Sequence, residues 1–156
     1  MKIFQFLAST ALSLVVLNAT AQNDVPKGFA KGSITLVDNT TLNGYVKDRI
    51  SKDASIVYLN NGKETVYKGS QLNAAETTTG NFICIHGDFF KVISTGNPGI
   101  LQKSSDASSQ ASYNGLEVVF NNGTEGNPGD YFEYNEKTKE LKLTAKKKSN
   151  AVVARQ

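Results

Sequence analysis

The sequence predicts an all-β fold in which antiparallel hairpins form a sandwich or a barrel-like roll of about eight to ten strands. Short apolar, aromatic and β-branched stretches recur along the chain, and turn-forming residues separate them. From Gly32 onward, no stretch long enough for a stable helix shows helical periodicity. Some strands carry adjacent apolar residues, such as Phe89 and Phe90, which point to opposite faces. Both faces therefore need cover, which favours a sandwich or roll over a sheet that is wet on one side.

Alternation and turn chemistry justify the strands in order. Ile34 and Leu36 alternate with polar neighbours, which is typical of a half-buried strand. Asn61-Gly62 supplies the positive φ angles that a tight type I′ hairpin turn requires. His86-Gly87-Asp88 is another short connection, with glycine at its most permissive point. The predicted strands cover residues 33–37, 41–47, 55–59, 63–67, 82–85, 89–93, 100–103, 116–120, 131–134 and 140–144.

Two connections differ from these tight turns. Residues 69–80 form a longer crossing segment, in which we expect one helical turn around 72–76. Residues 104–114 are rich in serine and poor in large apolar side chains, which predicts a mobile loop.

The sequence Gly-Asn-Pro-Gly occurs at 96–99 and again at 126–129. Proline followed by glycine suits the two central positions of a type II turn, so we expect such a turn at both places.

The first residues are typical of a secretory signal peptide. Lys2 precedes an apolar run over 3–17, and Ala19-Thr20-Ala21 ends just before Gln22. The run is shorter than the roughly twenty apolar residues that cross a bilayer, which favours cleavage over retention as an anchor. We therefore expect a periplasmic or secreted product with no stable membrane span after cleavage. The predicted organisation is a signal peptide over 1–21, a linker over 22–27, a single β domain over 28–145 and a basic tail over 146–156.

Charge is concentrated near the C-terminus. The formal net charge of the chain is +3, which is too small to support nucleic-acid binding. Six lysines lie between Lys137 and Lys148, with Glu140 among them. Such a segment either attracts an anionic envelope surface or is a solvated tail, and composition favours the tail.

Three residues are candidates for catalysis, although no complete catalytic motif is present. Cys84 and His86 lie two residues apart, so on a strand they share a face, and Asp88 follows after another two. A nucleophilic thiol needs a nearby base and an environment that favours the thiolate. The apolar neighbours of Cys84 instead favour a small buried side chain. We therefore predict no catalytic residue, with His86, Asp88 and Cys84 as weak candidates.

Other chemistry has no support in the sequence. A single cysteine excludes an internal disulfide framework, and one histidine with one cysteine shows no metal-ligand spacing. The chain carries no EF-hand loop, no Gly-x-Ser-x-Gly elbow and no phosphate-binding glycine motif. We therefore expect no metal site and no cofactor.

The chain resembles a loose group of small uncharacterised secreted proteins from Bacteroidota-type bacteria. The segments that carry the resemblance are the signal ending ATAQ at 19–22, the hairpin GSITLVDNTTLNGYV at 32–46, and GDFFKVI at 87–93 followed by GILQK at 99–103. The resemblance implies a Gram-negative envelope setting and a β-rich fold. It implies no activity.

Three hypotheses for function follow from the sequence. The first is an exported noncatalytic binding or structural module of the cell envelope, which contacts a protein or glycan through loops and an exposed strand edge, with self-association as a further possibility. The second is a small-ligand carrier with an apolar cavity inside a β-barrel. The third is a small hydrolase that uses His86 with Asp88 or Cys84.

Overall fold

The fold is all-β, as predicted, and the described part of the chain forms ten antiparallel strands in one sheet and two short strands in a separate ribbon. The structure is a computed structural model and describes residues 25–109, 111–113, 118–120 and 123–147. The predicted signal peptide, the first half of the linker and most of the basic tail lie outside the described residues. The strands are β1 (Ala30–Leu36), β2 (Thr41–Arg49), β3 (Ser55–Asn60), β4 (Lys63–Lys68), β5 (Leu72–Thr77), β6 (Gly80–Ile85), β7 (Asp88–Ser94), β8 (Gly99–Lys103), β9 (Ala111–Tyr113), β10 (Val118–Phe120), β11 (Tyr131–Asn135) and β12 (Glu140–Ala145).

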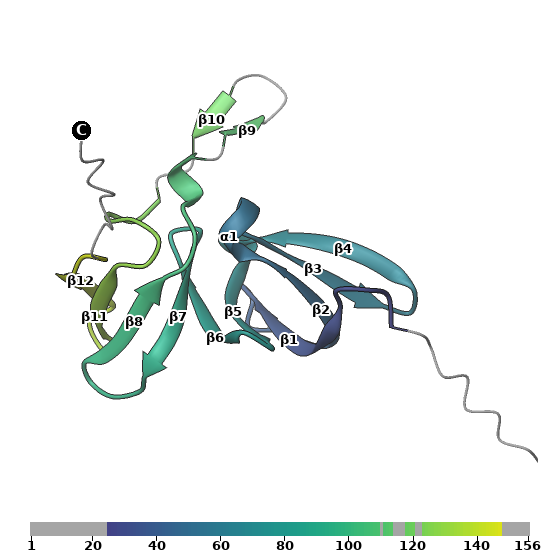
Figure 1. Cartoon of the computed structure of the whole chain (residues 1–156), viewed down its shortest axis with the longest axis horizontal. Coiled ribbons are helices and arrows are strands. Elements are labelled where there is room, and N and C mark those ends of the chain that lie inside the picture. Colours follow the sequence, from purple (N-terminus) through teal and green to yellow (C-terminus); the bar gives the residue numbers. More distant parts are fainter. Residues whose placement is uncertain (1–24, 110, 114–117, 121–122, 148–156) are drawn as a thin grey trace, which may run out of the picture.

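The large sheet is open and has the order β12-β11-β8-β7-β6-β5-β1-β2-β3-β4. Most strands pair with their neighbours in sequence, but β5 lies beside β1 and β11 lies beside β8. Figure 1 shows β1 to β4 at one end of the molecule and β8, β11 and β12 at the other. The short helix α1 (Ile50–Asp53) joins β2 to β3, and the 3-10 turns are η1 (Gly69–Gln71) and η2 (Ala107–Ser109).

Two tight hairpin turns follow the predicted chemistry. Asn61 and Gly62 have φ angles of 50° and 75° and connect the paired residues Asn60 and Lys63. The β6–β7 turn has the same form, because His86 and Gly87 have φ angles of 50° and 85°. Positive φ at both central residues is typical of a type I′ turn. Histidine is among the few residue types enriched in this region of φ, which gives His86 a structural reason for its position.

Two hydrophobic clusters use opposite faces of the central strands. On β7, Phe89 packs in cluster 1 and Phe90 in cluster 2, and neither side chain has exposed surface. The prediction that both faces need cover is therefore confirmed at β7. The buried members of cluster 1 are Ile34, Val46, Ile50, Ala54, Ile56, Tyr58, Leu72, Ala75, Phe82, Phe89 and Ala107. Those of cluster 2 are Phe90, Leu101 and Phe132, and Ile83, Ile85, Val92, Tyr134, Leu141 and Leu143 pack partly buried against them.

The structure corrects two expectations about the connecting segments. Residues 72–76 are not helical but belong to β5, which pairs with β1 on one side and β6 on the other. The helical turn lies just before, at Gly69–Gln71. The first part of the expected mobile loop at 104–114 is instead packed, because Ser105 and Ala107 are only 1% and 3% exposed. Both residues bind Asp88, and this contact supplies the ordering that their own side chains cannot.

The two Gly-Asn-Pro-Gly segments fold differently. In the second segment, Gly129 has a φ angle of 101° and the Asp130 N–H donates to the Asn127 carbonyl oxygen at 3.0 Å, as a type II turn requires. The first segment forms no such turn, because Gly99 already lies in β8 without a positive φ angle. The prediction of a type II turn is thus confirmed at 126–129 and wrong at 96–99.

Candidate functional site

A groove between β6 and the β11–β12 hairpin is the main candidate site. It has a volume of about 570 Å³. Its walls come from the end of β6, from the segment that precedes β11, and from one face of β11 and β12. The lining residues are Cys84, Ile85, His86, Gly123, Thr124, Glu125, Phe132, Tyr134, Lys139, Leu141 and Leu143.

The groove is apolar because its strands turn alternate side chains toward it. On β12, Leu141 and Leu143 alternate with Glu140 and Lys142, and only the leucines are partly buried. Each leucine lies opposite an aromatic residue of β11 in the ladder, with Leu143 beside Phe132 and Leu141 beside Tyr134. Phe132 is buried on the Phe90 ring, with the centroids 5.3 Å apart.

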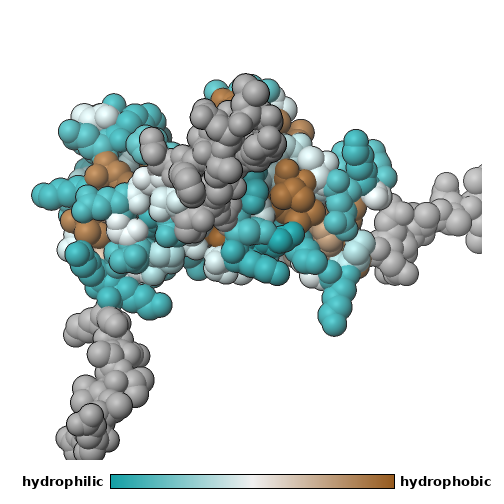
Figure 2. Space-filling model, turned by 90° about the horizontal axis from the view of Figure 1, so that it is seen from above, coloured by the Kyte–Doolittle hydropathy of each residue, from teal (hydrophilic) through white to brown (hydrophobic). Residues whose placement is uncertain are grey.

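Cluster 2 is therefore a core that is only partly covered. Three of its side chains are buried, whereas the other six are half-buried. Figure 2 shows apolar surface at the end of the molecule that carries β11 and β12, among hydrophilic atoms. Half-buried apolar side chains around a groove retain surface that a ligand or partner can remove from water.

The polar groups of the groove lie at its rim. His86 lies in the β6–β7 turn, Glu125 lies in the segment that precedes β11, and Lys139 is the last residue of the β11–β12 turn. All three side chains are exposed. The arrangement of an apolar floor and a few polar rim groups is typical of binding sites.

A buried ion pair fixes one end of the groove. Lys103 Nζ lies 3.2 Å from Asp88 Oδ2, and both side chains are shielded from solvent. The Thr124 N–H and hydroxyl both donate to this oxygen, each at 2.7 Å. The Ser105 hydroxyl and the Ala107 N–H donate to the other carboxylate oxygen, at 3.2 and 2.6 Å. Asp88 thus ties β7 to β8 and to two segments that are distant in sequence.

Lys103 completes the attachment of the groove wall. Its ammonium group donates to the carbonyl oxygens of Thr124 and Gly126, at 2.6 and 2.9 Å. Among the described residues, no buried side-chain nitrogen or oxygen lacks a hydrogen-bond partner. A fully satisfied pair of this kind holds structure together and offers no free group for chemistry.

The Cys84 side chain belongs to cluster 1, although its residue lines the groove. Cys84 packs partly buried against cluster 1, whereas its neighbours Ile83 and Ile85 pack against cluster 2. Burial, together with the negative charge of Asp88, raises the pKa of the Cys84 thiol to about 12. The thiol is therefore neutral at physiological pH.

The three candidate catalytic residues lie near one another but do not form a catalytic unit. The Asp88 carboxylate is occupied by the ion pair, and the His86 side chain makes no hydrogen bond or ion pair with the part of the chain that the structure describes. A nucleophile needs a base within hydrogen-bond reach and a base needs an orienting partner. The geometry provides neither for Cys84 and His86, so we assign them no step.

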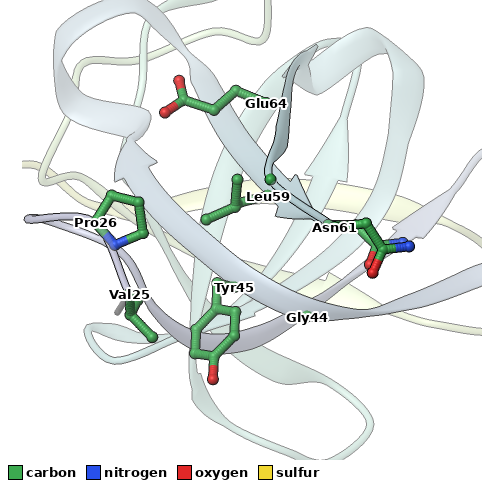
Figure 3. A pocket seen from close by; sticks show the side chains of 9 residues that line it. Val25, Pro26, Gly44, Tyr45, Leu59, Asn61 and Glu64 are labelled. Carbon is green, nitrogen blue, oxygen red and sulfur yellow. The ribbon is translucent and has the colours of Figure 1, made fainter. Parts of the chain in front are cut away.

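A second pocket lies on the other half of the sheet. It has a volume of about 590 Å³ and is bounded by Val25 and Pro26 on one side and by β2, β3 and β4 on the other. Figure 3 shows the Leu59 side chain between Pro26 and the Asn61 turn, with Glu64 and Tyr45 on either side. Leu59 is 7% exposed. This pocket therefore lacks the band of half-buried aliphatic side chains that lines the groove.

The described residues contain neither a metal-ligand cluster nor a membrane-spanning helix. Within residues 25–109, 111–113, 118–120 and 123–147, no group of three or more His, Cys, Asp or Glu residues is placed to hold a metal ion. In the same ranges, no helix has the length and apolar character needed to cross a membrane. No protein-family model matches the chain, and neither the characterised proteins nor the solved structures contain a significant match.

Sequence reasoning found only part of this site. It selected Cys84, His86 and Asp88 for their chemistry, and it placed Leu141 and Leu143 on a strand without identifying them as groove residues. It missed Lys103, although a lysine at the end of Ile100-Leu101-Gln102 is a signal for a buried cation with an anionic partner.

Proposed function

We propose that the protein is an exported noncatalytic binding module of the cell envelope, and that the groove between β6 and β11–β12 is its binding surface. The incomplete cover of cluster 2 carries this proposal. Six half-buried apolar side chains surround only three buried ones, and four of the six, Ile85, Tyr134, Leu141 and Leu143, line a groove of about 570 Å³. Burial of this surface supplies binding free energy without any catalytic group.

The export part of the proposal rests on the predicted signal peptide at 1–21. The fold is compatible with an oxidising compartment, because the only cysteine, Cys84, packs against cluster 1. A partly buried neutral thiol reacts slowly with oxidants and with other thiols.

A small-ligand carrier is the second candidate, and the size of the groove favours it. Ligand sites usually have volumes of about 300–1,000 Å³, and the groove lies in this range. The carrier hypothesis from sequence places the ligand inside a closed barrel, however, and the ten-stranded sheet is open. The carrier would therefore hold its ligand in a groove with one side exposed.

An apolar fluorescent dye tests the binding surface. We expect 1-anilinonaphthalene-8-sulfonate to fluoresce with the wild-type chain, and the Leu141→Ser/Leu143→Ser variant to bind the dye about tenfold more weakly or worse. Val66→Ser is the matched control, because Val66 is an exposed apolar residue on the other end strand, β4. Circular dichroism should show that all three proteins are folded, because partly unfolded states also bind this dye. Unchanged dye binding in the double variant would overturn the assignment of the groove.

Native mass spectrometry separates the two candidates. The protein purified from the organism that makes it should retain a second polypeptide if it is an interaction module. A retained small molecule, lost in the Leu141→Ser/Leu143→Ser variant, would instead establish a carrier.

A further inference from the structure

The outer edge of β12 is open to a further strand. β12 ends the large sheet and pairs with β11 on one side only, among the residues that the structure describes. In an antiparallel strand, alternate residues direct their N–H and C=O groups away from the neighbour. An exposed edge of this kind is a template for an added strand.

The side chains of β12 match the requirements of strand addition. Leu141 and Leu143 face the groove, whereas Glu140, Lys142 and Thr144 are exposed. A strand beside β12 would therefore place every second side chain on the same face as Leu141 and Leu143, which line the groove together with Ile85 and Tyr134. Its other side chains would lie beside Lys142.

Charge around β12 selects the kind of strand. Between residues 137 and 147 the chain carries five lysines and one glutamate, and all five lysines are exposed. They lie before β12, within it and after it. Glu133, opposite Lys142 in the ladder, and Asp130, bonded to the Lys147 N–H, offset part of this charge. The remaining excess is positive, so an acidic segment complements it.

The other end strand lacks this combination. The inward-facing Tyr67 of β4 packs edge-to-face on Tyr58 at the well-covered cluster 1. The charges of β4 are mixed, because Glu64 lies between Lys63 and Lys68. The Lys68 ammonium group also donates to the Asp53 carbonyl oxygen at 3.1 Å.

We infer that the groove binds an extended acidic segment of a partner protein, which adds to β12 as a further antiparallel or parallel strand. Apolar residues at alternate positions of this segment fill the groove, and acidic residues between them lie beside the lysines of β12 and its flanks. This inference rests on the proposed function and specifies the ligand of the same groove.

A designed peptide tests the inference on the full chain. The probe is a fluorescein-labelled peptide of about seven residues in which glutamate alternates with valine and leucine. We expect fluorescence anisotropy to show binding that weakens as salt is added. The Leu141→Ser/Leu143→Ser variant should bind about tenfold more weakly. The Lys139→Glu/Lys142→Glu variant should lose binding, whereas the Lys63→Glu/Val66→Ser variant of β4 should keep it.

Two modified peptides test backbone pairing directly. N-methylation of one alternate set of amides should abolish binding, because those N–H groups pair with β12, whereas methylation of the other set should leave binding largely intact. Equal affinity of both methylated peptides would overturn strand addition. Equal affinity of a peptide with lysine in place of glutamate would overturn the charge argument.

The remaining outcomes separate this inference from the proposed function. If the dye binds through the groove but the peptide does not bind, the inference fails and the proposed function stands. If neither binds through the groove, both fail. A dimer in analytical ultracentrifugation that the Leu141→Ser/Leu143→Ser variant abolishes would also overturn the inference, because a second copy would then occupy β12.

Discussion

Cluster 1 and cluster 2 are built from the same sheet, yet one is covered and the other is open. Cluster 1 has eleven buried side chains, among them Phe82 and Phe89, whose rings meet edge-to-face. Cluster 2 has three, and six half-buried neighbours surround them. The strands β6 and β7 contribute to both clusters, because their alternate side chains point to opposite faces.

This difference gives the two clusters different roles, because cluster 1 contributes mainly to stability and cluster 2 retains surface for binding. A covered cluster gains nothing from a partner, whereas an open cluster keeps apolar surface that a partner can bury. The shared strand β7 gives the open cluster a rigid support, since Phe89 and Phe90 are both fully buried. A binding surface on a rigid support loses little conformational entropy when a partner binds.

The largest expected effect comes from the ion pair that joins the two regions. Lys103→Met leaves the buried Asp88 carboxylate without its cation, and we expect it to lower the free energy of unfolding by about 3–5 kcal/mol. The double variant Asp88→Asn/Lys103→Met should lose less than the sum of the two single variants, because it leaves no unpaired charge. Urea unfolding measures all four proteins. A loss below about 1 kcal/mol in Lys103→Met would show that the pair is not buried as described.

The comparison predicts unequal costs for similar truncations in the two clusters. Ile56 is fully buried in cluster 1, and Ile56→Ala should cost about 2–5 kcal/mol. Leu143 is half-buried at the rim of cluster 2, and Leu143→Ala should cost about 1 kcal/mol or less. Urea midpoints of the two variants give the difference. Equal costs would mean that cluster 2 is as well covered as cluster 1, and the groove would lose its physical basis.

Local pattern was sufficient to predict much of the fold. The Asn61-Gly62 turn, the opposed Phe89 and Phe90, and the alternation of Leu141 and Leu143 all depend on neighbouring residues. The formation of β5, in contrast, does not depend on neighbouring residues alone. Its alanines and glutamate favour a helix locally, and it is a strand because it pairs with β1 and β6.

The candidate site was harder to predict because its parts meet only in the folded chain. Asp88 and His86 were selected as chemical groups, but Asp88 binds Lys103 and Thr124, and His86 forms a turn. The segments that supply the partners of Asp88 lie 15 or more positions after it in the chain. No local sequence pattern predicts contacts over such a separation. The groove exists because β11 and β12 cover cluster 2 only in part. The alternation of apolar and polar residues predicts which side chains of a strand share a face, but not how completely that face is covered.

Thiol chemistry reports on the covered cluster. Because the pKa of Cys84 rises from 9.0 to about 12 in the folded protein, its thiolate fraction at pH 8 should fall by about a thousandfold. We therefore expect the thiol to react with 5,5′-dithiobis(2-nitrobenzoic acid) at least about a thousandfold more slowly in the native protein than in the protein unfolded in urea. Because burial disfavours the thiolate, this group leaves the free energy of unfolding unchanged below about pH 9.0 and lowers it as the pH rises from 9.0 toward about 12. Rapid native labelling would place the thiol in the open groove instead of against cluster 1.

The smallest expected effect concerns Asp130, where β11 begins. The backbone N–H groups of Asn127 and Lys147 donate to its carboxylate at 2.9 and 2.7 Å, and these bonds hold its pKa below 3.8. Since the folded pKa lies below the unfolded one, the stabilisation is present above about pH 4 and is lost as the pH falls through the folded pKa. Asp130→Asn should therefore destabilise the protein at pH 6, and its difference from wild type should shrink at low pH.

A matched aspartate in the other half of the molecule completes this test. Asp38 also has a lowered pKa, because the Thr40 N–H donates to it at 2.8 Å, but it lies in the β1–β2 turn beside cluster 1. Hydrogen exchange should speed up in β11 and β12 for Asp130→Asn and not for Asp38→Asn. An open cluster has few contacts to hold its strands once such a bond is removed, so its amides should respond first. Faster exchange in β11 and β12 for both variants would show that the two regions open together, and that the groove is no less stable than the covered core.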